Sequence, residues 1–102
     1  MKTDRLEEVE HIMIKLKENL PFFKEKYKGK TLGVFGSYIR GEQKKKSDVD
    51  ILVDFEKPID LLDFVGMELE LSEILGKKVD LVPKNALKPR IGKRILEEVK
   101  YI

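Results

Sequence analysis

The sequence predicts a small α+β domain in which short strands alternate with helices around one hydrophobic core. Three short apolar segments, at residues 31–36, 48–55 and 78–82, have the length and composition of strands. Longer segments carry apolar residues at three- and four-residue steps, which is typical of amphipathic helices. A chain of 102 residues has the length of one domain, so residues 1–102 are expected to form a single domain.

The first helix is expected over about residues 4–20 or slightly beyond, ending near Pro21 because proline interrupts the helical hydrogen bonds. Its expected core face consists of Leu6, Val9, Met13, Leu16 and Leu20. His11 lies in this helix without a partner at metal-ligand spacing, so we interpret it as an ordinary residue.

Residues 31–36, TLGVFG, are apolar and end in glycine, which favours a buried strand. The following SYIRG has room for one or two helical turns, and the loop EQKKKS is polar. In the next strand, DVDILVDF, polar and apolar residues alternate at first. Asp48 and Asp50 are therefore expected to point to the same face of the strand.

Asp60 has the position of a helix N-cap, and Gly76 that of a stop, for a helix that runs to Leu75. Its apolar stripe consists of Phe64, Met67, Leu71, Ile74 and Leu75. The run MELEL alternates like a strand, but the distance between the two cap signals favours a helix.

The third strand, residues 78–82, is closed by Pro83. A final helix is expected over residues 91–100, with its apolar side chains inside. These side chains are Ile91, Ile95, Leu96 and Val99.

The composition limits the class of protein. Hydrophobic residues make up 41% and charged residues 39%, which suits a folded domain with a highly charged surface. No cysteine occurs, so disulfides and thiolate metal sites are excluded, and a cytoplasmic location is expected. The N-terminal segment resembles neither a signal peptide nor a membrane span, so no membrane association is expected.

The charges are unevenly distributed along the chain. Residues 48–75 carry 9 acids and 1 base, whereas residues 1–47 carry 12 bases and 7 acids and residues 76–102 carry 8 bases and 3 acids. An acidic centre is a poor match to a nucleic-acid surface, so no stable nucleic-acid binding is expected. It suits a cation site beside groups that hold phosphates.

Two carboxylates on one face at the start of a strand repel each other when they are partly buried. A divalent cation such as Mg²⁺ would relieve this repulsion at Asp48 and Asp50, because it takes oxygen ligands from carboxylates and phosphates. If the third strand lies beside the second, Asp80 can join the pair as a ligand and proton acceptor. Gly36 and Ser37 fit the phosphate end of such a site, since glycine lets backbone N–H groups approach an anion and serine adds a hydroxyl.

These motifs, GSYIRG, SDVDILV and VDL, resemble those of the minimal nucleotidyltransferases of the DNA polymerase beta superfamily. The resemblance covers nearly the whole chain and implies the polymerase beta palm type of fold, with a three- to four-stranded mixed sheet. It implies that Gly36 and Ser37 bind the nucleoside triphosphate. It further implies that Asp48 and Asp50 hold two Mg²⁺ ions, and that Asp80 completes the metal set and acts as general base. For Arg40, a contact to phosphate and a structural ion pair with an acid both stay open.

The family's reaction is the transfer of a nucleoside monophosphate to a hydroxyl group, with release of pyrophosphate. A catalytic core this small resembles the members that pair with a HEPN-type RNase toxin. The resemblance implies an antitoxin that transfers AMP from ATP to a tyrosine hydroxyl of that toxin.

Two alternatives stay open at this point. The chain could neutralise a partner by contact alone, as a binding module with vestigial carboxylates. It could also transfer the nucleotide to RNA or to a small molecule such as an aminoglycoside. Homo-oligomerisation is left open as well, because exposed apolar surface on the central or last helix would serve either a partner or a second copy.

Overall fold

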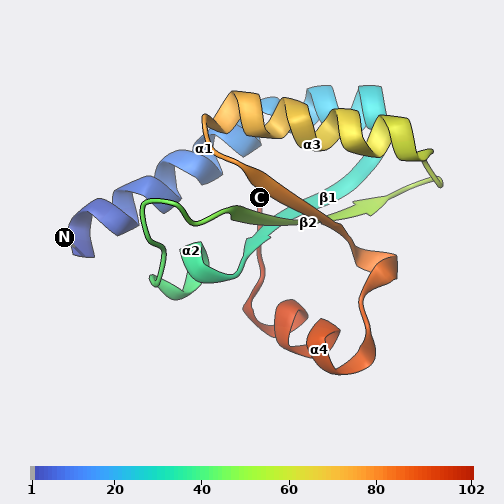
Figure 1. The fold of residues 1–102 in the computed structure, drawn as a ribbon. Coiled ribbons are helices and arrows are strands. Elements are labelled where there is room, and N and C mark those ends of the chain that lie inside the picture. Colours follow the sequence, from blue (N-terminus) through green and yellow to red (C-terminus); the bar gives the residue numbers. More distant parts are fainter. Residues whose placement is uncertain (1) are drawn as a thin grey trace.

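The computed structural model describes residues 2–102, which form a four-stranded sheet with helices on both sides (Figure 1). In chain order the elements are α1 (Lys2–Tyr27), β1 (Gly29–Phe35), α2 (Ser37–Arg40), β2 (Val49–Phe55), α3 (Leu61–Leu75), β3 (Val79–Pro83), a 3-10 turn (Lys84–Ala86), α4 (Pro89–Glu98) and β4 (Lys100–Tyr101). The predicted α+β class and the predicted order of elements are confirmed, and β4 is an addition to them.

The strands lie in the order β3-β2-β1-β4. Strand β1 is antiparallel to both β2 and β4, whereas β2 and β3 are parallel. A parallel pair needs a long crossover, which α3 provides. Figure 1 shows α1 and α3 together over one side of the sheet and α4 on the opposite side. The mixed sheet that the family resemblance implied is therefore confirmed.

The hydrophobic core lies between the sheet and the layer formed by α1 and α3. Its fully buried members include Leu16, Phe23, Leu32, Val34, Val49, Ile51, Val53, Met67 and Leu71. Burying one such side chain stabilises the fold by about 1.5–3 kcal/mol. Because three of these residues come from β2, the core fixes this strand and with it the acids at its start.

Helix α3 has the predicted bounds and caps. The Asp60 carboxylate accepts a hydrogen bond of 2.9 Å from the Asp63 N–H, and Gly76 ends the helix in the left-handed conformation with φ 65°. Met67, Leu71 and Leu75 are buried against the core, as their helical spacing predicted. Length and capping therefore outweigh the strand-like alternation of MELEL.

The predicted end of the first helix near Pro21 was wrong, because α1 passes through this proline and continues to Tyr27. A proline inside a helix costs roughly 3 kcal/mol. The turns beyond it bury Phe23 completely and Tyr27 almost completely, and the two rings stack with centroids 5.9 Å apart. Two buried aromatic side chains contribute about as much as the proline costs or more.

The predicted core face of this helix was wrong at its first position. Leu6 is 65% exposed, whereas Leu16 is fully buried and Ile12, which was not predicted, is also buried. Figure 1 shows that the N-terminal part of α1 extends past the sheet.

The final helix differs most from its prediction. Ile91 and Leu96 are exposed instead of buried, and the helix ends at Glu98. Lys100 and Tyr101 then form β4 beside Val34 and Gly33 of β1. The helix ends early because the last residues pair with the open edge of β1. None of the helices within residues 2–102 combines the length and apolarity that a membrane span requires.

Candidate active site

Asp50 in β2 and Asp80 in β3 are directly paired positions of the parallel strand pair. Side chains of directly paired residues project to the same face of a sheet. Asp48 lies two residues before Asp50, just ahead of β2, and its side chain therefore belongs to the same face. The fold thus brings the three predicted acids to one end of β2 and β3.

Electrostatics identify Asp50 as the centre of this acidic group. Burial, and then the negative charges of Asp80 and Asp48, raise the pKa of the Asp50 carboxyl from 3.8 to about 6. The positive charge of Arg40 acts in the opposite direction but does not cancel the effect. A cation beside this carboxylate would be bound favourably, because a positive ion stabilises the buried negative charge and offsets the repulsion from Asp80 and Asp48.

Gly36 packs directly against Asp50. Its φ of 80° lies in the region that favours glycine, and a β-carbon at this position would collide with the Asp50 carboxylate. Phe35, the preceding residue, is paired with Asp50 across β1 and β2. The glycine of the Gly-Ser turn is therefore required both by its backbone conformation and by the approach of the acid.

Helix α2 begins directly after this turn. The Gly36 carbonyl accepts hydrogen bonds of 3.1 Å from the N–H groups of Ile39 and Arg40. Tyr38 is buried and anchors the short helix to the core, while Ser37 stays partly exposed beside Gly36. The predicted helical turn is confirmed, and Ser37 lies at its start.

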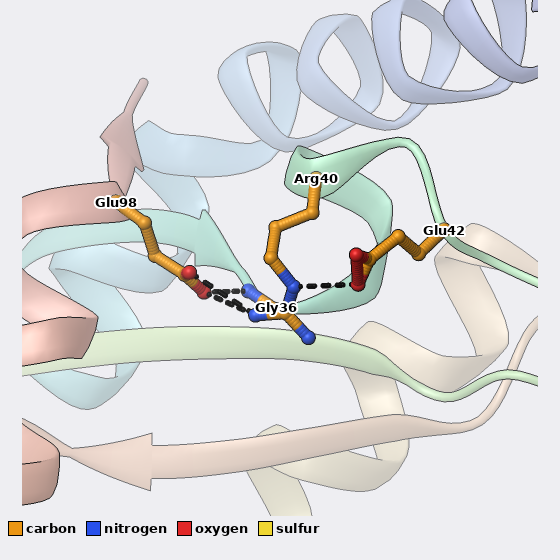
Figure 2. Close-up of polar contacts among 4 residues, drawn as sticks. All are labelled: Gly36, Arg40, Glu42 and Glu98. Carbon is orange, nitrogen blue, oxygen red and sulfur yellow. Dashed lines mark hydrogen bonds and ion pairs between the residues drawn. The ribbon is translucent and has the colours of Figure 1, made fainter.

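Arg40 reaches back toward Gly36 and lies between two glutamates (Figure 2). Its Nε donates to Glu42 Oε1 at 2.8 Å, and its Nη1 donates to Glu98 Oε2 at 3.0 Å and Oε1 at 3.1 Å. Both ion pairs raise the pKa of the guanidinium, the bond to Glu42 most. Arg40 therefore forms the structural ion pair that was one of its two expected roles. Its guanidinium lies beside the Gly-Ser turn.

Glu98 was missed at the sequence level. It lies seven residues after Ile91 and three after Ile95, on the side of α4 that was expected to be apolar. A charged residue on such a face needs a buried partner, and this was the available signal. The partners, Gly36 and Arg40, lie about sixty residues away in sequence, so no local pattern could name them.

A cavity of about 290 Å³ joins these parts between α4 and the ends of β1 and β2. It is lined by Phe35, Gly36, Arg40, Asp50, Ile91, Arg94, Ile95 and Glu98. A larger cavity of about 610 Å³ lies at the other end of β2, around residues 53–61 and 83–85. The larger cavity contains none of the predicted site residues, so chemistry and not size identifies the smaller one as the candidate site.

The donor set of this site suits magnesium only in part. Among the described residues, no three acidic or histidine side chains converge closely enough to hold one metal ion. Asp48 Oδ2 instead lies 4.0 Å from Lys78 Nζ. Mg²⁺, however, commonly uses one or two protein carboxylates and takes its remaining oxygens from phosphates and water. The acids around Asp50 therefore fit an ion that is held jointly with a nucleotide.

Comparisons with known proteins agree with this chemistry. Residues 16–102 match the nucleotidyltransferase domain family. The protein adenylyltransferase MntA of Thermococcus cleftensis is 50% identical over 97 residues, covering 95% of each chain. A solved structure described as a minimal nucleotidyltransferase superposes with a TM-score of 0.78 at 34% identity, covering 90% of this chain and 93% of that one. A toxin-antitoxin structure with AMP-PNP has a TM-score of 0.67 at 26% identity, covering 91% of this chain and 70% of that one.

The chain belongs to the nucleotidyltransferase domain family. The enzyme class inferred from GSYIRG, SDVDILV and VDL is thereby confirmed, and so is the fold that the resemblance implied.

Proposed function

We propose that this chain is a Mg²⁺-dependent adenylyltransferase that transfers AMP from ATP to a tyrosine hydroxyl of a HEPN-type toxin and so acts as its antitoxin. The observation that carries the proposal is the pairing of Asp50 with Asp80 beside the Gly36 turn. The likeness to MntA, which is named a protein adenylyltransferase, supports the choice of AMP and of a protein acceptor.

The Gly-Ser turn and Arg40 bind the triphosphate in this proposal. Backbone N–H groups at the start of α2 and the Ser37 hydroxyl donate to phosphate oxygens. Arg40 lines the same cavity as Gly36 and, together with Arg94, places positive charge beside the acids. The structure with AMP-PNP, an ATP analogue, supports ATP as the nucleotide.

The three acids carry the chemistry. Asp48 and Asp50 would hold two Mg²⁺ ions together with the phosphates, and bound Mg²⁺ would supply positive charge for the attacking and leaving oxygens. Asp80 contributes to the metal set and accepts the proton of the acceptor hydroxyl. The hydroxyl oxygen forms a bond to the α-phosphorus, the bond from this phosphorus to the bridging oxygen breaks, and pyrophosphate leaves.

A HEPN-type partner and a cytoplasmic location complete the proposal. The toxin-antitoxin structure with AMP-PNP supports pairing with a toxin, since its fold is shared over 91% of this chain. Residues 48–75, which contain Asp48 and Asp50, are strongly acidic, and this argues against a nucleic acid as a stable partner.

The test is a reconstituted reaction with ATP, Mg²⁺ and the purified partner, followed by mass spectrometry of the partner. The partner should gain the mass of AMP with the wild-type chain and none with Asp48→Asn. Peptide mapping should place the added AMP on a tyrosine. No transfer by a folded wild-type chain would overturn the proposal.

The alternative of neutralisation by contact alone has one observation in its favour, because the described side chains contain no ready-made set of three metal ligands. The two functions differ in cells. If Asp48→Ala and Asp50→Ala still neutralise the toxin, contact suffices. If they release the toxin while still binding it, neutralisation requires the transfer.

A further inference from the structure

Glu98 ties the C-terminal segment to the Gly-Ser turn. Its Oε2 accepts a hydrogen bond of 2.6 Å from the Gly36 N–H, and both carboxylate oxygens accept from Arg40 Nη1 (Figure 2). The Glu98 side chain is 25% exposed and that of Arg40 46%, so the bond to the Gly36 N–H is partly shielded from water whereas the ion pair is open to it. Bonds of this kind are stronger than neutral hydrogen bonds.

These contacts restrict a side chain that is otherwise flexible. An arginine loses about 2 kcal/mol of rotamer entropy when it is fixed in one conformation. Glu42 holds Nε of Arg40 from one side and Glu98 holds Nη1 from the other. Figure 2 shows the third guanidinium nitrogen pointing away from Glu98, with no bond to the residues drawn. Arg40 is therefore oriented in advance and keeps donor capacity for a ligand.

Glu98 is itself held in place by the residues that follow it. Val99 packs so closely on Gly33 that a β-carbon there would collide with it. Lys100 pairs with Val34 in the sheet, and the Ile102 N–H donates to the Leu32 carbonyl at 3.0 Å. A residue fixed by a strand on its C-terminal side has little freedom to leave the turn.

Glu98 could instead have the opposite role, because a carboxylate beside Gly36 could compete with a phosphate for the same donors. In that role Glu98 would have to move away when the nucleotide binds. Its anchoring by β4 opposes such a movement, and Arg40 keeps one nitrogen unbonded to either glutamate. The geometry favours a fixed support over a competitor.

We propose that Glu98 is a positioning residue for nucleotidyl transfer, which fixes the backbone of the Gly36 turn and the Arg40 guanidinium beside the place where the triphosphate binds. This inference rests on the proposed function, since it assumes that the turn takes a nucleoside triphosphate. In this proposal β4 contributes to the site, because its pairing with β1 fixes the position of Glu98.

The test compares ATP affinity by calorimetry, at constant Mg²⁺, among wild type, Glu98→Gln, Glu98→Asp and the control Glu97→Gln. Glu97 is exposed on the same helix, so its variant should bind ATP like the wild type. Glu98→Gln should bind about tenfold more weakly, the typical effect of losing a hydrogen bond to a charged group. Glu98→Asp, which retains the carboxylate, should recover part of that loss, and it serves as the folded probe if the glutamine variant does not fold.

A second comparison asks whether Glu98 acts through Arg40. In an Arg40→Ala background, the loss caused by Glu98→Gln should be clearly smaller than in the wild type. In the transfer reaction, Glu98→Gln should raise KM for ATP more than it lowers kcat. Equal losses in both backgrounds, unchanged affinity, or tighter binding would each overturn the proposal, and tighter binding would make Glu98 a competitor.

The binding assay separates this inference from the proposed function. If the wild type binds ATP but transfers nothing, the proposed function fails while the effect of Glu98 on ATP binding still decides its role. If the wild type does not bind ATP in the presence of Mg²⁺, both proposals are overturned.

Discussion

Asp50 and Asp80 face each other across adjacent parallel strands, at the end of the sheet where Gly36 closes against the Asp50 carboxylate. Strands β2 and β3 contain no lysine or arginine that would compensate these two negative charges. The relationship costs stability in the isolated chain, because it places like charges together. It becomes favourable once a cation and a nucleotide are bound, which is the reason to expect it in an enzyme.

The burial of Asp50, together with this repulsion, predicts a pH dependence of stability. The folded state raises the pKa of Asp50 from 3.8 to about 6, so between these values the folded chain binds more protons than the unfolded chain. The contribution of Asp50 is therefore fully present below the lower value and is lost as the pH rises through about 6.

Urea denaturation without divalent cations, at about pH 4 and about pH 7, measures this effect. Asp50→Asn should show a smaller fall in the free energy of unfolding than the wild type over that range. The same loss in both proteins would show that Asp50 does not titrate as the structure indicates. Mg²⁺ with ATP should also bind more weakly below about pH 6, because the carboxyl is then protonated.

Substitution of Gly36 should be more damaging than substitution of Gly41. Both residues have positive φ values, 80° and 71°, so each alanine variant pays a backbone penalty of about 1–2 kcal/mol. A β-carbon at Gly36 also collides with Asp50, whereas one at Gly41 meets nothing within 4 Å. Gly36→Ala should therefore lose ATP binding and at least 1 kcal/mol more stability than Gly41→Ala. Similar values of both quantities for the two variants would contradict this view of the turn.

Two leucines of α3 provide a matched test of the core. Leu71 is fully buried between the sheet and α1, whereas Leu69 is 64% exposed on the same helix. Leu71→Ala should lower the free energy of unfolding by about 2–5 kcal/mol, and Leu69→Ala by less than about 1 kcal/mol. Chemical denaturation of both variants gives the comparison. A large loss at Leu69 would show that the outer face of α3 is covered in solution.

Pro21 gives a prediction of the opposite sign. Since α1 continues through it, Pro21→Ala should restore a helical hydrogen bond and stabilise the chain by about 1–3 kcal/mol. Glu25→Ala, an exposed change in the same helix, should alter stability by less than about 0.5 kcal/mol. A Pro21→Ala chain that is less stable than the wild type would contradict this prediction.

The site could be predicted from the sequence to the extent that its signals are local. The alternation around Asp48 and Asp50, and the cap signals at Asp60 and Gly76, depend on neighbouring residues, and all of them give the observed elements. The pairing of Asp80 with Asp50 depends on which strands become neighbours, and no local pattern determines that.

What the sequence could not provide depends on contacts between distant segments. Phe23 and Tyr27 keep α1 helical beyond Pro21 only because a core is there to bury them. Likewise, the last residues leave α4 because β1 offers an open edge, and Glu98 is positioned by that exit. Hydrophobic periodicity within one segment carries no information about either event.

In the proposed function, Asp48, Asp50 and Asp80 beside the Gly-Ser turn support the transfer of AMP to a protein partner. The most direct measurement is the intact mass of the proposed HEPN-type partner after co-expression with the wild-type chain or with Asp48→Asn. The partner should gain one or more AMP groups, on tyrosine, with the wild type only. An unmodified partner in both cultures, with both chains folded and bound to it, would contradict it.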